Sequence, residues 1–259
     1  MAAFFDVDNT IIRGASAFHI ARGLHARGYF KTSDIARFAI DQMRYVMFGE
    51  SKEQIDRIRD KGLSIIRGWS VAEMATIGEE IYDEVLALRI FAGTKAILDR
   101  HLAAGHEVWL VTASPVEIGR IIARRLGCTG ALGTVAERSR GLYTGALVGP
   151  LLHGEKKAEA ARALAEERGI DLGASYAYGD SLNDTFILES VGNPTAINPE
   201  PRLRKHAKKA GWPIQDFRGK NGDGRRSIMQ KTATGTVWVL LTVFRGLKRA
   251  LRALFPRGT

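Results

Sequence analysis

The sequence predicts an α/β fold in which helices cover both faces of a mostly parallel sheet, with an all-helical segment inserted after the first strand. Short apolar runs alternate with helix-length segments after residue 90, and such alternation is typical of parallel sheets. Residues 14–90 instead repeat apolar positions at helical spacing and carry little strand signal. The 259 residues, 45% of them apolar, suffice for one large domain with an inserted module.

The first predicted strand covers residues 3–7 and leads into the run Asp6-Val7-Asp8-Asn9-Thr10. It places two carboxylates at its C-terminal end, which is where ligands bind in open α/β sheets. A buried acid costs free energy unless it is paired or holds a metal. The two carboxylates therefore predict a metal site, a reactive carboxylate with an acid/base partner, or both.

The inserted segment is predicted to contain about four helices. Apolar residues recur at helical spacing in residues 18–24, 35–46 and 55–66. Ser51 with Gln54, and Ser70 with Glu73, have the spacing of capping boxes and predict two helix starts. A helical insert directly behind the first strand predicts a lid over the end of that strand.

The alternation of strands and helices resumes after the insert. Helices are expected at residues 94–104, 116–126, 155–168 and 182–190, and strands at 107–112 and 175–178, with a last strand ending at residues 196–198. Residues 129–147, rich in Gly, Thr and Val, predict a hairpin with its turn near Ser139-Arg140-Gly141. Residues 1–13 and 91–218 together form the predicted core domain.

The positive charge of the chain is concentrated at its C-terminal end. Residues 201–259 hold 15 Lys/Arg and 2 Asp/Glu, a net charge of +13, whereas the whole chain carries +10. The first 200 residues are therefore mildly acidic, and the basic end suggests an anionic partner. A tail whose charges serve only solvation would give the same pattern.

Residues 219–231 are polar and glycine-rich and predict a linker, and residues 232–259 predict a basic amphipathic helix. Its apolar stretch is far shorter than the roughly 20 residues that span a bilayer. Peripheral contact with an anionic membrane is one interpretation of this helix. Docking on the body, or on another copy of the chain as an oligomer contact, is an interpretation of equal weight.

The N-terminal residues contain no basic region and no long apolar segment. We therefore expect no signal peptide and a cytoplasmic location, peripheral on the inner membrane surface if the C-terminal helix binds lipid. Cys128 is the single cysteine, so no intrachain disulfide forms, which fits a reducing compartment.

Four polar motifs follow one another, each at or near a predicted strand end or helix start. They are Asp6 with Asp8, Thr112 at the end of the strand 107–112, Lys157 in the first turn of the helix 155–168, and the run Asp180-Ser181-Leu182-Asn183-Asp184 after the strand 175–178. A parallel sheet gathers such positions along one edge.

These residue types fit phosphoryl transfer, in which cations and hydrogen-bond donors stabilise negatively charged oxygens. Lys157 supplies a cation, with Lys156 as a near competitor. Thr112 supplies a hydroxyl, with Ser114 as its competitor, and backbone N–H groups around Ala113 add donors.

The carboxylates supply the remaining chemistry. Asp180, with Asp6 and a carbonyl near Asp8, gives the oxygen-rich shell that Mg²⁺ prefers. One carboxylate of the first motif can attack phosphorus and form an aspartyl-phosphate. The other can protonate the leaving alkoxide and later deprotonate the attacking water.

With these four motifs, residues 3–213 resemble the haloacid dehalogenase superfamily, and most of all its phosphoserine-phosphatase-like branch, subfamily IB. The resemblance implies a Rossmannoid core with an inserted helical C1 cap, here residues 14–90. It implies a Mg²⁺-dependent phosphatase in which Asp6 is the nucleophile and Asp8 the acid/base. It further implies phosphate contacts from Thr112, Lys157 and Asn183, and a metal site built from Asp6, Asp8, Asp180 and Asp184.

The first motif also separates activities within the superfamily. A carboxylate at Asp8 favours a phosphatase or phosphomutase over a haloalkanoate dehalogenase, because a halide leaves without a general acid. P-type ATPases share the motif logic but need many spanning helices, which this chain lacks.

The sequence departs from phosphoserine phosphatases where those enzymes hold the substrate amine and carboxylate. Ala15 stands where they carry a glutamate, and their cap arginine falls near Gly62, with Arg59 and Arg67 nearby. Loss of charged partners weakens binding of a zwitterion. We therefore expect another small phosphomonoester, lipid phosphates included, with phosphoserine as the alternative.

A function of another class would be a protein whose basic C-terminal region binds an anionic surface or nucleic acid. Only Trp212 and Phe217 interleave the basic run 202–231, so base stacking is not indicated and nucleic acid is not favoured. We expect a small phosphorylated substrate as the main partner.

Overall fold

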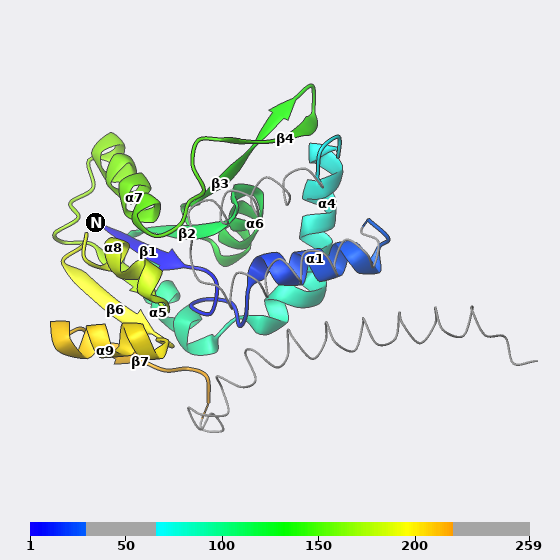
Figure 1. Ribbon diagram of the computed structural model, residues 1–259. Helices are drawn as coiled ribbons and strands as arrows, with labels where there is room; N and C mark the ends of the chain where they lie inside the picture. Colours follow the sequence, from blue (N-terminus) through cyan, green and yellow to red (C-terminus); the bar gives the residue numbers. More distant parts are fainter. Residues whose placement is uncertain (30–65, 220–259) are drawn as a thin grey trace, which may run out of the picture. The chain divides into compact units, whose positions relative to one another are not determined.

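The computed structural model describes residues 1–29 and 66–219, and at its centre lies a seven-stranded sheet (Figure 1). The strand order is β4-β3-β2-β1-β5-β6-β7. Neighbouring strands are parallel except β3 and β4, which are antiparallel. The strands are β1 (Ala2–Asp6), β2 (Glu107–Pro115), β3 (Gly130–Ser139), β4 (Leu142–Val148), β5 (Tyr176–Gly179), β6 (Asn193–Ile197) and β7 (Ile214–Gln215).

Helices make most of the connections between these strands. Between β1 and β2 the structure describes α1 (Ser16–Ala26), α4 (Val71–Ile81), the π-helical turn η1 (Tyr82–Leu86), the 3-10 turn η2 (Ala87–Arg89) and α5 (Ala92–Ala103). Later come α6 (Val116–Leu126), α7 (Glu155–Arg168), the 3-10 turn η3 (Leu182–Asp184), α8 (Thr185–Leu188) and α9 (Pro201–Ala210). The hydroxyl of Ser70 accepts a hydrogen bond from the N–H of Glu73, so the helix start expected there is confirmed.

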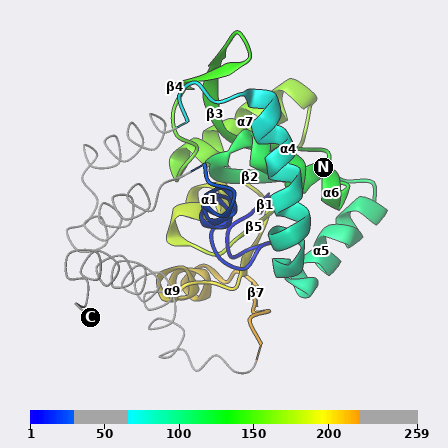
Figure 2. The same cartoon turned by 90° about the vertical axis from the view of Figure 1, so that its right-hand side faces the viewer.

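The sheet buries side chains on both faces, because successive residues of a strand point to opposite sides. Phe4 and Phe5 of β1 are both fully buried, but they belong to different apolar clusters. Phe5 lies in the cluster formed with α5 and α6, whereas Phe4 lies in the cluster formed with α7, α8 and α9. Figure 2 shows α5 and α6 on one side of the strands and α9 on the other. The predicted α/β architecture is confirmed.

The hairpin expected within residues 129–147 is formed by β3 and β4. Arg138 pairs with Tyr143, and Ser139 with Leu142, on the two sides of the turn. The turn residues Arg140 and Gly141 have φ values of 50° and 79°. Positive φ at both positions is what a two-residue type I′ turn requires, and it matches the right-handed twist of the strands.

The structure adds two elements, α9 and β7, that the sequence analysis does not anticipate. Pro201 lies in the first turn of α9, and Gly211 ends the helix with a φ of 72°, which are ordinary start and stop signals. Only Leu203 and Ala207 of this helix are buried, so its apolar stripe is narrow. The helix expected over residues 182–190 is also shorter and divided, with η3 ending at Asp184 and α8 at Leu188.

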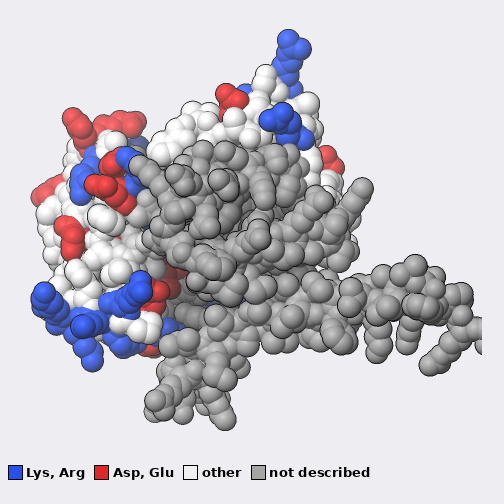
Figure 3. All heavy atoms as spheres, viewed as in Figure 1, with Lys and Arg blue, Asp and Glu red and all other residues white. Residues whose placement is uncertain are grey.

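Part of the C-terminal positive charge lies on α9. Its exposed cations are Arg202, Lys205, Lys208 and Lys209. Figure 3 shows Lys and Arg gathered at the lower left, over the place where Figure 1 draws α9. Part of the positive charge counted in residues 201–259 therefore belongs to α9, which packs on the sheet through Leu203.

The described residues include no helix that is long and apolar enough to cross a membrane. Several predictions fall in residues 30–65 and 220–259, outside the described residues: the helix start at Ser51, the middle of the insert, most of the linker and the amphipathic C-terminal helix.

Candidate active site

The site lies at the C-terminal ends of the three central strands. β1 is flanked by β2 and β5, with Asp6 opposite Val111 and Phe5 opposite Tyr178. Asp6 therefore ends its strand beside Thr112, and Asp180 follows the end of β5. This register is why four motifs far apart in sequence meet along one edge.

Lys157 connects two of the predicted carboxylates. Its Nζ lies 2.6 Å from Oδ1 of Asp6 and 2.7 Å from Oδ1 of Asp184, and all three side chains are buried. Lys157 occupies the first turn of α7, which begins after Gly154 at a φ of 56°. Lys156 instead pairs with Glu159 at the surface. Of the two competing lysines, Lys157 is the one that reaches the carboxylates.

Three carboxylates gather at this point. Oxygen atoms of Asp6, Asp180 and Asp184 lie within 4.8 Å of one another, and all three residues are buried. When all three carboxylates are ionised, the positive charge of Lys157 offsets only one of their negative charges. An all-oxygen donor set with this surplus fits a hard divalent cation such as Mg²⁺. The side chain of Asp8 is not among the three, so a part for Asp8 in the metal site stays a prediction.

Burial and neighbouring charge act in opposite directions on these groups. Burial raises the pKa of Asp6 to about 7, although Lys157 acts against the rise. Burial also disfavours the charge on Lys157, but the two carboxylates outweigh it and hold its pKa above the ordinary value. For Asp184 the charge of Lys157 and hydrogen bonds from Ser181 outweigh burial and lower the pKa. A bound divalent cation would favour the ionised form of Asp6 in the same way.

The loop after β5 holds Asp184 from two directions. The N–H and the hydroxyl of Ser181 donate to Oδ2 of Asp184 at 3.0 and 2.8 Å. A Cβ at position 179 would come within 2.6 Å of the Asp184 side chain, so Gly179 is required for this close approach. Asn183, the predicted phosphate contact, is half-buried in η3 of the same loop.

The loop after β1 is held in a tight conformation. Asn9 has a φ of 60°, and its Oδ1 accepts the N–H of Gly14 at 3.1 Å. The carboxylate of Asp8 accepts the N–H of Ser16, the first residue of α1, at 2.8 Å. Asn198, fully buried with a φ of 47°, donates from Nδ2 to the carbonyl of Asn9 at 2.9 Å. Sequence reasoning misses Ser16 and Asn198, although asparagine at a strand end is a known signal for left-handed backbone.

The second motif contributes a buried hydroxyl next to this loop. Thr112 is 1% exposed, and its Oγ1 accepts the N–H of Ser114 at 3.1 Å. The carbonyl of Ala113 accepts the hydroxyl of Thr134 at 2.7 Å, which fixes the peptide that follows Thr112. The predicted phosphate-binding residues of this motif therefore sit on rigid backbone at the same edge as Asp6.

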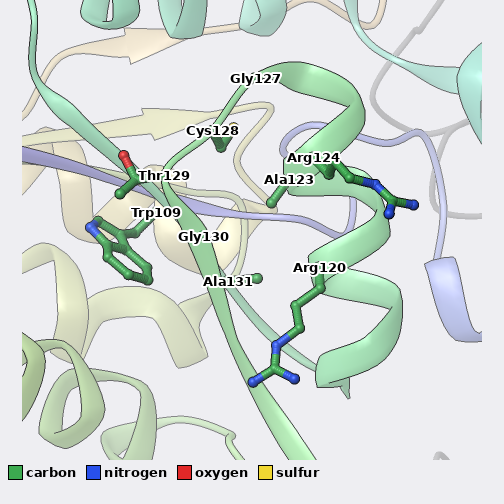
Figure 4. Close-up of a pocket in the computed structure, with 9 residues that line it drawn as sticks. All are labelled: Trp109, Arg120, Ala123, Arg124, Gly127, Cys128, Thr129, Gly130 and Ala131. Carbon is green, nitrogen blue, oxygen red and sulfur yellow. The ribbon is translucent and has the colours of Figure 1, made fainter.

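A surface depression of about 530 Å³ lies elsewhere, where α6 passes into β3 (Figure 4). Figure 4 shows Arg120 and Arg124 extending from α6 on one side of β3 and the indole of Trp109 on the other. Burial raises the pKa of Cys128 in its lining to about 12, so this thiol is protonated at neutral pH. None of the predicted site residues lines this depression.

Comparisons with known proteins agree with this geometry. The model of the family described as haloacid dehalogenase-like hydrolase matches residues 3–189. Phosphoserine phosphatase SerB1 of Mycobacterium tuberculosis is 48% identical over 235 residues, covering 90% of this chain and 76% of that protein. Histidinol-phosphatase of Neisseria meningitidis is 29% identical over 220 residues, covering 83% and 98%.

A solved structure supports the same assignment. The crystal structure of a Bordetella pertussis protein with unknown function is 31% identical, covers 83% of this chain and 98% of its own, and superposes with a TM-score of 0.75. The family model spans all four motifs, and the strand order gathers those motifs at one edge. The chain is therefore an enzyme of the haloacid dehalogenase-like hydrolase family.

Proposed function

We propose that this protein is a Mg²⁺-dependent phosphomonoester hydrolase that acts through an aspartyl-phosphate. The observation that carries the proposal is the buried group formed by Lys157 and the carboxylates of Asp6, Asp180 and Asp184. When its carboxylates are ionised, the surplus of negative charge suits a divalent cation, and Lys157 suits the transferring phosphoryl group. Asp6, Asp180 and Asp184 would hold Mg²⁺, which would supply positive charge that offsets the repulsion between the Asp6 carboxylate and a phosphoryl group.

In this mechanism Asp6 attacks phosphorus with a carboxylate oxygen, and the bond from phosphorus to the ester oxygen breaks. Asp8 gives its proton to the departing alkoxide, which leaves as an alcohol. A water molecule then attacks the phosphorus of the aspartyl-phosphate and passes a proton back to Asp8. Inorganic phosphate departs and Asp6 is restored. Thr112, the backbone around Ala113, Lys157 and Asn183 hold the phosphoryl oxygens throughout.

The substrate is proposed as a small phosphomonoester of the kind handled by subfamily IB. Two observations favour different members of that class. The 48% identity to a protein named phosphoserine phosphatase favours phosphoserine as the second candidate. Ala15, in place of a charged partner for the amine, favours a substrate whose recognition does not depend on that charge.

A panel of phosphoesters tests the proposal: p-nitrophenyl phosphate, phosphoserine, histidinol phosphate and lysophosphatidic acid, each with Mg²⁺ and with EDTA. Asp6→Asn is expected to lose turnover of every ester by at least about 10³-fold, because an amide is not a nucleophile. Lys156→Ala, at the surface, serves as the matched control and retains full turnover. Full activity of Asp6→Asn would overturn the mechanism.

The C-terminal residues suggest a lipid phosphate within the same substrate class and a peripheral, cytoplasmic location. This part of the proposal rests on the amphipathic pattern of residues 232–259 alone. Deletion of all residues after Arg226 is expected to abolish binding to anionic liposomes and to leave hydrolysis of p-nitrophenyl phosphate intact. Equal liposome binding with and without the tail would remove this part of the proposal.

A further inference from the structure

Two buried serines join the loop that carries Asp8 to the end of β2, the strand that carries Thr112. The hydroxyl oxygens of Ser16 and Ser114 lie 2.9 Å apart, although 98 positions separate the residues in sequence. Ser16 is 0% and Ser114 6% exposed, so water does not compete for this hydrogen bond. Ser16 opens α1, and Ser114 lies one residue before the end of β2.

Each serine also bonds a predicted site residue through its backbone. The N–H of Ser16 donates to Oδ1 of Asp8 at 2.8 Å, and the N–H of Ser114 donates to Oγ1 of Thr112 at 3.1 Å. A continuous chain of hydrogen bonds therefore runs from Asp8 through Ser16 and Ser114 to Thr112. It joins the loop after β1 to the end of β2 through one bond between side chains and two bonds donated by backbone N–H groups.

This series of hydrogen bonds matters because Asp8 and Thr112 have different partners in the proposed reaction. Asp8 must reach the leaving oxygen, while Thr112 holds the phosphoryl group. Proton transfer requires heavy-atom distances of about 2.6–3.2 Å, and a displacement of about 1 Å can cost on the order of 100-fold in rate. The N–H of Ser16 is also one of the unpaired donors at the start of α1, so the same contact satisfies the helix end and orients the carboxylate.

We propose that Ser16 and Ser114 form a positioning pair that sets Asp8 relative to Thr112, and thereby places the acid/base against the leaving oxygen. The inference deepens the proposed phosphomonoesterase activity and rests on it. The pair acts through Asp8 and Thr112 and takes no part in bond making itself. The sequence leaves Ser114 as an alternative to Thr112 for the phosphate contact, but in the structure its hydroxyl lies against that of Ser16.

The leaving group provides the test. An alkyl phosphate needs Asp8 to protonate a strongly basic alkoxide, whereas p-nitrophenyl phosphate releases a stable phenolate without that help. Ser16→Ala and Ser114→Ala are expected to lower kcat for the alkyl ester about tenfold or more, and for p-nitrophenyl phosphate about threefold or less. The ratio of the two kcat values does not depend on the folded fraction of a preparation, so it separates positioning from stability.

Ser175→Ala is the matched control. Ser175 is also fully buried and hydrogen bonded, accepting the N–H of Ala2 at 2.9 Å, but it lies at the opposite end of β1. Its loss removes a buried hydroxyl without touching the site, and the ratio is expected to stay at the wild-type value. Ser114→Thr keeps the hydroxyl and is expected to restore the ratio lost in Ser114→Ala.

The double variant Ser16→Ala/Ser114→Ala completes the test. If the two hydroxyls act as a unit, kcat of the double variant for the alkyl ester falls no further than that of either single variant. Removal of one hydroxyl already interrupts the series of hydrogen bonds. Equal losses on both esters, or additive losses in the double variant, would overturn the pair. Asp6→Asn is measured alongside: if it is inactive while the serine variants keep the wild-type ratio, the pair fails and the proposed function stands. An active Asp6→Asn enzyme would remove both.

Discussion

Two buried polar networks lie next to each other in this protein, and only one of them is charged. The charged network consists of Lys157, Asp6 and Asp184. The neutral network is the pair His101 and Tyr178, in which Nε2 of His101 lies 2.7 Å from the hydroxyl of Tyr178. The two meet at β1, where Phe5 stacks on Tyr178 at a centroid distance of 4.3 Å and Asp6 follows in sequence.

Burial acts on the two networks with different results. Desolvation lowers the pKa of His101 to about 4 and raises that of Tyr178 to about 12, so both are uncharged at neutral pH. In the charged network the opposite charges lie within hydrogen-bonding distance, and Lys157 acts against the burial that raises the pKa of Asp6. A buried ion pair contributes little more stability than well-packed neutral groups. The neutral network therefore suits a role in the fold, whereas the charged network suits the chemistry proposed for it.

The substitution Lys157→Met in the charged network is expected to have the largest effect on stability and turnover. It leaves Asp6 and Asp184 buried without their cation, which costs about 3–5 kcal/mol of unfolding free energy. It also removes a phosphoryl contact, so kcat is expected to fall by about 10²–10³-fold. Urea unfolding and phosphoester turnover measure the two effects. Lys156→Met is the control and changes neither; turnover of Lys157→Met close to the wild-type value would contradict the assignment.

Binding of Mg²⁺ at the charged network is expected to have the next largest effect, because it stabilises the folded state. Mg²⁺ at about 100 times its Kd stabilises the folded state by about 2.7 kcal/mol if it binds only that state. The rise in Tm on adding Mg²⁺, and its reversal by EDTA, measure the effect without an activity assay. Asp180→Asn removes one of the three carboxylates and should reduce the rise strongly, whereas His101→Gln should leave it unchanged. An undiminished rise in Asp180→Asn would exclude this metal site.

The neutral network has the smallest expected effect on turnover, and its effect on the free energy of unfolding depends on pH. The pKa of His101 falls from 6.5 to about 4 on folding, so the unfolded chain takes up its proton first as the pH decreases. The contribution of His101 is complete above pH 6.5 and is lost between pH 6.5 and about 4, at no more than about 1.4 kcal/mol per pH unit. Urea unfolding at several pH values should show that the unfolding free energy of His101→Gln depends less steeply on pH than that of the wild type. Turnover at pH 7 should be unchanged. Identical slopes would show that His101 contributes no such proton uptake.

Site residues could be predicted where a short segment of sequence shows both their residue type and their place at a strand end or helix start. Asp6, Thr112, Lys157 and Asp180 each stand at a strand end or a helix start, and the parallel sheet then brings them together. Patterns in single segments carry that information. The choice between Lys156 and Lys157 needed the structure, since burial alone separates adjacent residues of one helix turn.

What the sequence does not reveal is the pairing of distant residues. The bond between Ser16 and Ser114 depends on the register of β1 against β2 and on the direction in which α1 leaves the loop. Asn198 reaches Asn9 only because β6 ends near the same edge. The helix α9 was hidden for another reason: its two buried residues give too narrow an apolar stripe among basic side chains.

The central place of β1 has a consequence for how the enzyme is made. This strand is synthesised before both of its neighbours, which begin at Glu107 and Tyr176. At about 5–20 residues per second, Asp6 waits on the order of ten seconds or more for Asp184 to be synthesised. Pairing over such separations is also intrinsically slow. A nascent chain that stops before Asp180 carries Asp6, the proposed nucleophile, but not the complete proposed site, so hydrolysis is expected to begin only when most of the core has been translated.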